Sequence, residues 1–128
     1  MRLSILFAGA ALLAMTGYAQ AEGDATKGEA VFKKCKVCHM VGPGAKNNVG
    51  PNLTGVVGRK AGTIPEFKYS QAMIDAGATK GVAWTDETID QYLAAPTTFV
   101  PGNKMLFVGL KDAAERADVI AYLKKFPQ

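Results

Sequence analysis

The sequence predicts an all-α fold, a small domain of three to five helices joined by long loops. Apolar residues recur at helical spacing in three stretches, near residues 25–35, 86–95 and 113–123. No stretch has the alternating apolar and polar pattern of a half-buried strand. Glycine, proline and asparagine crowd two further segments, 40–64 and 97–109, which therefore read as loops. Long loops in a small domain are usually functional.

The first residues have the features of a cleaved secretory signal peptide. Arg2 gives a short basic start, residues 3–17 are mostly apolar, and residues 19–21 spell the A-x-A cleavage pattern. The apolar stretch is too short and poorly flanked for a spanning helix, although an uncleaved anchor is the alternative. We therefore expect residues 1–21 to be removed and residues 22–128 to form one domain.

The first helix is expected to begin at about Ala25, after Asp24 as its N-cap, and to run into the cysteine-bearing stretch that follows. Helical spacing places four residues on its buried face, namely Gly28, Val31, Phe32 and Cys35. A glycine lowers helix stability. Gly28 therefore indicates either the close approach of another element or an idle glycine, and this residue alone does not separate the two.

Three further helices are expected. A short one spans about 67–76. A clearer one follows Thr85, a good N-cap, and ends before Pro96. The last begins with the D-x-x-E pattern at Asp112 and ends before Pro127. The residues expected on the buried faces of the last two helices are Ile89, Tyr92, Leu93, Val119, Ile120, Tyr122 and Leu123.

Residues 35–39 read C-K-V-C-H, the C-x-x-C-H sequence that attaches a c-type haem. On a helical turn Cys35, Cys38 and His39 share one face, so two thiols can bond the haem vinyl groups while the imidazole reaches the iron. A thioredoxin-like C-x-x-C requires a βαβ context that is absent here. A zinc site requires about four ligands, and the chain has two cysteines and one histidine. One covalent haem c is predicted.

The iron needs a ligand opposite His39. The candidates are Met40, Met73, Met105, a lysine or water, because no second histidine exists. Met40 adjoins His39 and cannot easily reach the opposite face, and Met73 lies in an expected helix, where methionine more often fills the core. Met105 lies in a Pro-Gly loop far enough along the chain to close over the ring. The sequence favours Met105.

Four separated motifs together resemble class I cytochrome c, in an order and spacing similar to mitochondrial cytochrome c and its bacterial relative, cytochrome c-two. They are C-K-V-C-H at 35–39, G-P-N-L at 50–53, P-G-N-K-M at 101–105 and A-Y-L-K-K at 121–125. The resemblance covers essentially the whole mature chain. It implies the small class I cytochrome c fold, with its loops wrapped around one covalent haem and with His39 and Met105 as axial ligands.

The resemblance also implies supporting residues. The Pro51 carbonyl would accept the ring N–H of His39, and Tyr92 would lie beside Met105. The residues implied to hydrogen-bond around a buried haem propionate are Arg59, Tyr69 and Trp84. Without the resemblance, the aromatic residues would be assigned to the core and Arg59 to the surface.

Two positions depart from the family pattern. Asn103 stands where threonine is common, and Met73 stands where asparagine is common near the buried propionate. Asn103 can still donate a hydrogen bond, whereas Met73 cannot. The resemblance therefore does not define the polar network in detail, nor the reduction potential that depends on it.

The implied function is that of a soluble, monomeric periplasmic one-electron carrier and not of an enzyme. Two filled axial positions leave no site for oxygen or peroxide. The implied donor is a cytochrome bc complex, and the acceptor is a photosynthetic reaction centre or a terminal oxidase. The rivals are a haem enzyme or sensor with an open sixth position, and a carrier dedicated to one dehydrogenase.

The formal net charge of the chain is +4, and +3 without Arg2, the only charged residue of the leader. Docking must therefore depend on where the lysines lie. The lysines that border the ligand-bearing loops are Lys34, Lys36, Lys46, Lys104 and Lys111. Each one alone is as readily a solvated surface charge. Export and a haem argue against nucleic acid as the partner.

Overall fold

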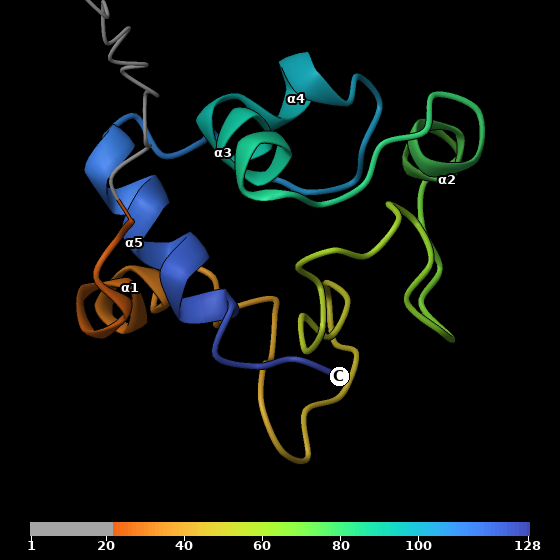
Figure 1. Cartoon of the computed structure of the whole chain (residues 1–128). Helices are drawn as coiled ribbons and strands as arrows, with labels where there is room; N and C mark the ends of the chain where they lie inside the picture. The colour runs from red at the N-terminus through yellow and green to blue at the C-terminus, as the bar shows by residue number, and fades with distance from the viewer. Residues whose placement is uncertain (1–21) are drawn as a thin grey trace, which may run out of the picture.

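The computed structural model describes residues 22–128, and this part of the chain is all-α (Figure 1). Its five helices are α1 (Ala25–Phe32), α2 (Gln71–Ala78), α3 (Asp86–Ala94), α4 (Pro96–Phe99) and α5 (Ala113–Leu123). The only β-pairing within residues 22–128 is an isolated bridge between Lys60 and Ala83. The prediction of an all-α fold with three to five helices is confirmed. The expected signal peptide, residues 1–21, lies outside the described residues.

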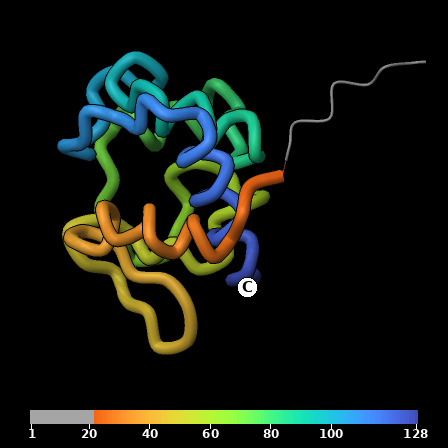
Figure 2. The backbone as a smooth tube through the Cα atoms, turned by 90° about the vertical axis from the view of Figure 1, so that its left-hand side faces the viewer, coloured from red at the N-terminus to blue at the C-terminus, as the bar shows by residue number. Residues whose placement is uncertain are grey.

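Helices α1 and α5 pack side by side and bring the two ends of the domain together (Figures 1 and 2). Asp24 caps α1 as expected, since its carboxylate accepts from the amides of Thr26 and Lys27 at 2.8 and 3.2 Å. A Cβ on Gly28 would lie 1.9 Å from the Asp118 carbonyl oxygen of α5. Close helix approach therefore explains Gly28, and the idle-glycine interpretation is wrong.

The core continues from this helix pair toward α3. The rings of Phe32 and Tyr122 lie 5.4 Å apart, and Phe32 and Val119 are the two largest completely buried side chains among the described residues. The other buried apolar residues are Val31, Val56, Ala61, Met73, Ala76, Trp84, Ile89, Val100, Leu110, Ile120 and Leu123. Most of the expected helix faces are thus buried, while Tyr92 and Leu93 are half-buried against this core.

Two predicted helix boundaries were wrong. Helix α1 ends at Phe32 and does not enter the cysteine-bearing stretch, because the next amides bond three residues back, as Cys35 does to Phe32 at 2.8 Å. Helix α2 begins at Gln71, not near residue 67, because the Ser70 hydroxyl caps it by accepting from the Met73 amide at 3.1 Å.

Glycine also allows α2 to extend further than expected. The helix continues through Gly77 to Ala78, where the sequence predicted a turn from residue 77. A Cβ on Gly77 would lie 1.9 Å from the Ala61 carbonyl oxygen, so this glycine permits α2 to pack directly on the backbone of the long loop. Helix α2 is therefore packed against the loop of residues 40–64 and helps to hold it in place.

Helices α3 and α5 lie where the sequence predicted them, and α4 is an additional helix. Thr85 caps α3 in a reciprocal pair with Thr88. Pro96 ends α3 as predicted, but it also begins α4, which the sequence analysis assigned to a loop. Proline suits the first position of a helix because that amide has no partner there. Asp112 caps α5 by accepting from the Ala114 amide at 2.8 Å.

The long loop after α1, golden in Figure 1, extends away from the helices at one end of the molecule. No helix among residues 22–128 is long and apolar enough to cross a membrane.

We expect Gly28→Ala to lower the free energy of unfolding by about 2 kcal/mol. Alanine gains about 1 kcal/mol in helix propensity, but its methyl group would meet the Asp118 backbone, which cannot rotate away. Denaturant unfolding of the haem-loaded protein measures the change. Lys27→Ala, at an exposed position of the same helix, is the control and should change stability by no more than about 0.5 kcal/mol. Equal stability of the two variants would contradict the packing argument.

Candidate haem-binding site

The three reactive side chains of the C-x-x-C-H motif lie on one turn of backbone. The amide of Cys38 donates to the Cys35 carbonyl at 3.1 Å, and that of His39 donates to the same carbonyl at 2.9 Å. This turn follows the end of α1 directly, so the packing of α1 on α5 fixes where it lies. Both cysteines are free thiols and half-buried. The turn presents two thiols and one imidazole together, as a haem c requires.

The imidazole of His39 is oriented by the loop that follows it. Its Nδ1 lies 2.8 Å from the Pro51 carbonyl oxygen, which is the contact that the resemblance implied. A Cβ on Gly50 would lie 2.4 Å from Cε1 of the ring, so only glycine lets the backbone approach so closely. With Nδ1 engaged as a donor, Nε2 is the nitrogen left to bind a metal.

Burial lowers the pKa of His39, and the hydrogen bond to Pro51 opposes this shift. The imidazole is thus neutral at neutral pH, which is the form that ligates iron. Burial also raises the pKa of Cys35 to about 11, against the opposing charge of Lys34. A thiol–disulfide centre needs a lowered cysteine pKa. The environment of Cys35 therefore disfavours the thioredoxin-like interpretation.

Tyr92 and Met105 are brought together as the resemblance implied. The Tyr92 hydroxyl lies 3.8 Å from the Met105 sulfur and donates toward it. The ring of Tyr92 lies 5.0 Å from that of Trp84 and 6.2 Å from that of Phe99, so aromatic packing fixes its position on α3. Burial raises the pKa of Tyr92 to about 12, so the hydroxyl keeps its proton.

Arg59 carries a polar group that lacks a partner. Its Nε is buried and has no hydrogen-bond partner within the described residues, and its Nη1 makes only a long bond of 3.4 Å to the Thr63 carbonyl. A buried donor without an acceptor is costly, and a cationic one is best satisfied by an anion. A haem propionate is such an anion, so this part of the chain fits the group.

The other two residues implied on the propionate side, Trp84 and Tyr69, lie near Arg59 in space. The Trp84 amide donates to the Arg59 carbonyl at 2.8 Å, and the indole is buried. The Tyr69 hydroxyl accepts from the Ile64 amide at 3.1 Å. Burial raises the pKa of Tyr69, while the Ile64 bond and the charge of Arg59 lower it.

The competing methionines have different surroundings. Met73 is buried in the core on α2, and Met40 is exposed next to His39. Both positions agree with the sequence argument that favoured Met105.

Two contributions escaped the sequence analysis. Gly50 permits the approach to the His39 ring, and its place in the G-P-N-L motif was the only signal for it. Asn103 was recognised only as a departure, yet its carboxamide binds the Met105 amide at 2.8 Å and two further carbonyls. A carboxamide in a loop has no periodic signal, so its partners are decided by the fold.

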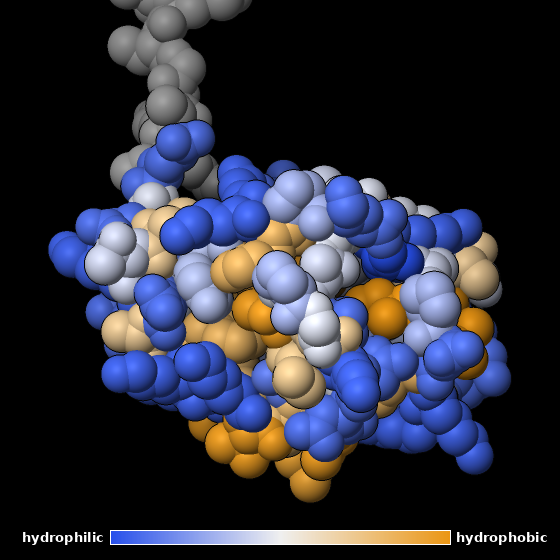
Figure 3. Space-filling view, turned by 90° about the horizontal axis from the view of Figure 1, so that it is seen from below, coloured by the Kyte–Doolittle hydropathy of each residue, from blue (hydrophilic) through white to orange (hydrophobic). Residues whose placement is uncertain are grey.

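The five candidate docking lysines are all exposed. Lys34 forms an ion pair with Glu115 at 3.3 Å, and Lys104 donates to the Lys68 carbonyl at 3.1 Å. Two apolar side chains next to Met105, Leu106 and Val108, are also exposed, by 102% and 84%. Figure 3 shows apolar side chains at the surface among hydrophilic ones, on the face seen from below.

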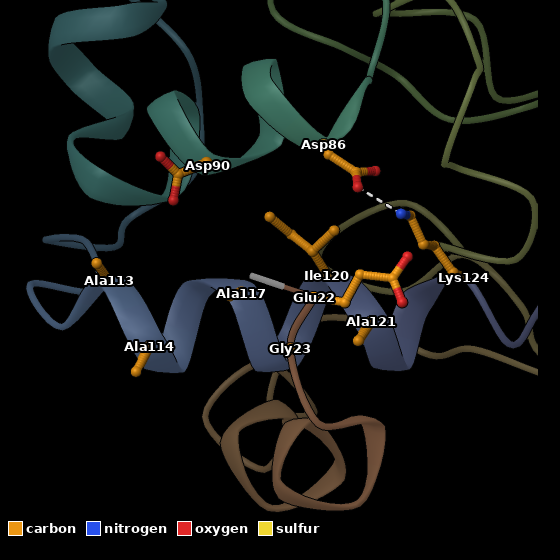
Figure 4. Close-up of a pocket in the computed structure, with 10 residues that line it drawn as sticks. All are labelled: Glu22, Gly23, Asp86, Asp90, Ala113, Ala114, Ala117, Ile120, Ala121 and Lys124. Atoms are coloured by element: carbon orange, nitrogen blue, oxygen red, sulfur yellow. Dashed lines mark hydrogen bonds and ion pairs between the residues drawn. The ribbon is translucent and has the colours of Figure 1, made fainter. Parts of the chain in front are cut away.

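A groove of about 490 Å³ lies between α3, α5 and the start of the described chain (Figure 4). None of the residues implied to bind the haem lines this groove. Two of its three carboxylates are already engaged, Asp86 with Lys124 and Asp90 with Arg116 at 2.7 Å. This groove is therefore not the haem site.

Comparison with known proteins agrees with this geometry. The sequence model of the family described as Cytochrome c matches residues 25–127. Cytochrome c2 of Rhodomicrobium vannielii is 53% identical over 121 residues, which cover 94% of this chain and 93% of the relative. The solved structure of cytochrome c2 from Rhodospirillum centenum superposes with a TM-score of 0.78 at 49% identity and covers 83% of this chain and 100% of that one. Cytochrome cH from Methylobacterium extorquens superposes with a TM-score of 0.73 at 43% identity and covers 80% of this chain and 99% of that one.

The chain belongs to the cytochrome c family. It binds one covalent haem c through its C-x-x-C-H motif, and the match to cytochrome c2 relatives supports its being an electron carrier.

We expect the pKa of the Tyr92 phenol to be about 12, above its ordinary value of 10, because the hydroxyl is buried. A raised pKa means that the folded protein holds this proton more tightly than the unfolded chain. The stability that Tyr92 provides is therefore complete below pH 10 and is lost as the pH rises through 12. NMR titration of Cζ-labelled tyrosine measures the pKa, and Tyr92→Phe identifies the signal. A Tyr92 signal that titrates near 10 would show that the hydroxyl is not buried.

Proposed function

We propose that this chain is a monomeric periplasmic one-electron carrier whose haem iron is held between His39 and Met105. The observation that carries the proposal is the fixed imidazole. Pro51 binds Nδ1 at 2.8 Å, which leaves Nε2 for the iron. Met105 supports the opposite position, because it is a thioether on a loop with the Tyr92 hydroxyl 3.8 Å from its sulfur.

The haem itself supplies an iron that exchanges one electron. In the proposal Cys35 and Cys38 attach it covalently. Arg59 donates its unpaired Nε–H to a propionate, with Tyr69 and Trp84 beside it. These residues do no chemistry of their own; they hold the group rigidly and exclude water, which limits the structural change that accompanies each transfer.

A thioether at the sixth position has two consequences. It stabilises the ferrous state and so raises the reduction potential. It also occupies the position that oxygen or peroxide would need, which favours electron transfer over catalysis. A haem enzyme or sensor, the rival from another class, would require Met105 to be absent from the iron.

We propose that residues 1–21 are a cleaved signal peptide and that residues 22–128 act in the periplasm. Docking would use exposed lysines around the apolar side chains of Leu106 and Val108. Such a surface suits brief contacts with an acidic partner that has an apolar centre. A cytochrome bc complex is the proposed donor, and a reaction centre or terminal oxidase is the proposed acceptor.

The first test is the visible spectrum of the ferric, haem-loaded protein. A weak red sulfur-to-iron band is expected that persists at low cyanide concentrations, because Met105 occupies the sixth position. Met105→Ala should remove the band and admit cyanide at once. Met40→Leu, which changes an exposed methionine beside His39, should leave the band unchanged. A wild-type protein without the band, or one that binds cyanide immediately, would favour the open-site rival.

The second test is the ionic-strength dependence of electron transfer from a purified cytochrome bc complex. If lysines steer docking, the second-order rate constant should fall by roughly tenfold or more from low to high salt. Lys111→Glu should lower the low-salt rate, whereas Lys80→Glu, at another exposed lysine outside the proposed docking set, should affect it less. A rate that does not depend on salt would count against a lysine-based docking surface.

A further inference from the structure

The carboxamide of Asn103 connects the Met105 loop to the preceding helix. Its Nδ2 donates to the Val100 carbonyl at 2.8 Å and to the Pro96 carbonyl at 3.0 Å. Its Oδ1 accepts from the Met105 amide at 2.8 Å and, more weakly, from the Tyr92 hydroxyl at 3.4 Å. One side chain thus binds both ends of α4 and the backbone of the methionine.

This set of contacts uses most of the hydrogen-bonding capacity of the side chain. A carboxamide has two N–H donors and an oxygen with two lone pairs. Both donors and one lone pair have partners of their own, and the single proton of the Tyr92 hydroxyl is shared between the Asn103 oxygen and the Met105 sulfur. The side chain is half-buried, which protects these bonds from competition by water. The contacts therefore form a closed cross-link and not a single surface hydrogen bond.

The loop has few other restraints of this kind. The Asn103 amide bonds the Val100 carbonyl at 3.1 Å, and the Phe107 amide bonds the Met105 carbonyl at 3.0 Å. The Nζ of Lys104 also donates to the Lys68 carbonyl at 3.1 Å, but this bond is exposed. Lys104 and Leu106, the neighbours of Met105, are both exposed. The Met105 amide itself bonds only to Asn103 among the described residues. The position of the Met105 backbone consequently depends on Asn103.

We propose that Asn103 is a positioning residue for Met105, which ties the methionine to α4 and thereby restrains opening of the sulfur–iron bond. This inference rests on the proposed function, in which Met105 is the sixth ligand. The Tyr92 hydroxyl holds the side-chain end of Met105 and Asn103 holds its backbone end. A loop that opens locally would have to break the Asn103 bonds first.

Threonine, which is common here in the family, cannot make the same cross-link. A threonine hydroxyl has one donor, so it cannot bond the Pro96 and Val100 carbonyls at the same time. Its branch is also one atom shorter than the carboxamide, so it reaches fewer of these partners. The cross-link is a property of asparagine at this position.

Imidazole binding to the ferric protein tests the proposal, because exogenous imidazole takes the sixth position only when Met105 leaves it. One hydrogen bond of ordinary net strength changes an equilibrium constant by about two- to tenfold. Asn103→Ala removes several bonds, so the apparent affinity for imidazole should rise by at least about tenfold. Asn103→Thr should give a smaller rise, because it restores one donor.

The control is Asn48→Ala, at an exposed asparagine of the other long loop. It should change imidazole affinity by less than about twofold. Unchanged affinity in Asn103→Ala would overturn the proposal.

Amide hydrogen exchange gives a second readout that needs no variant. In the wild-type haem-loaded protein the Met105 amide should exchange at least about tenfold more slowly than the exposed Leu106 amide, since only the former has a partner among the described residues. Equal exchange of the two amides would overturn the proposal even if the Asn103 variants failed to mature. In a matured Asn103→Ala the Met105 protection should be lost.

The failure of this inference differs from the failure of the proposed function. If Met105→Ala leaves the sulfur-to-iron band intact, Met105 is not the ligand and the proposed function fails. If the band depends on Met105 but Asn103→Ala alters neither imidazole affinity nor Met105 exchange, the function stands and only the role of Asn103 is refuted.

Discussion

The packing of α1 against α5 is the constraint on which the rest of the structure depends. The two helices approach until a Cβ on Gly28 would lie 1.9 Å from the Asp118 carbonyl, so only glycine permits the contact. The C-x-x-C-H turn begins directly after α1, and this contact therefore places both cysteines and His39 relative to the core. A small domain without a disulfide has few other means of fixing its first functional segment.

The two proposed axial ligands are supported in different ways. His39 lies on a turn attached to a helix, and the Pro51 carbonyl orients its ring at 2.8 Å. Met105 lies in irregular chain, so its restraint comes from side chains, namely the Asn103 carboxamide and the Tyr92 hydroxyl. Hydrogen-bonding side chains replace regular secondary structure where the backbone must stay open to a large group.

The interior of the domain holds an unpaired polar atom. Within residues 22–128 no polar or charged residue is buried as a whole, yet the Nε of Arg59 is buried and unpaired. A structure built from protein alone leaves that atom costly, and an anionic group beside it would remove the cost. The unpaired Nε of Arg59 is therefore the feature of the interior that fits an anionic group of the haem.

The sequence by itself determined the local features. The helix caps at Asp24, Thr85 and Asp112 depend on neighbouring residues, and all three were predicted correctly. The C-x-x-C-H motif is equally local, because its three side chains share one turn.

Only the tertiary structure decided what depends on distant contacts. The reason for Gly28 lies on α5, and the Ala61 backbone leaves no room for a side chain at Gly77. The Asn103 carboxamide joins its loop to Pro96 of α4 and Tyr92 of α3 through irregular chain. Each of these joins residues whose separation in the sequence carries no periodic pattern. They became visible only when the chain was folded, because packing and hydrogen bonding across elements, not local propensity, select them.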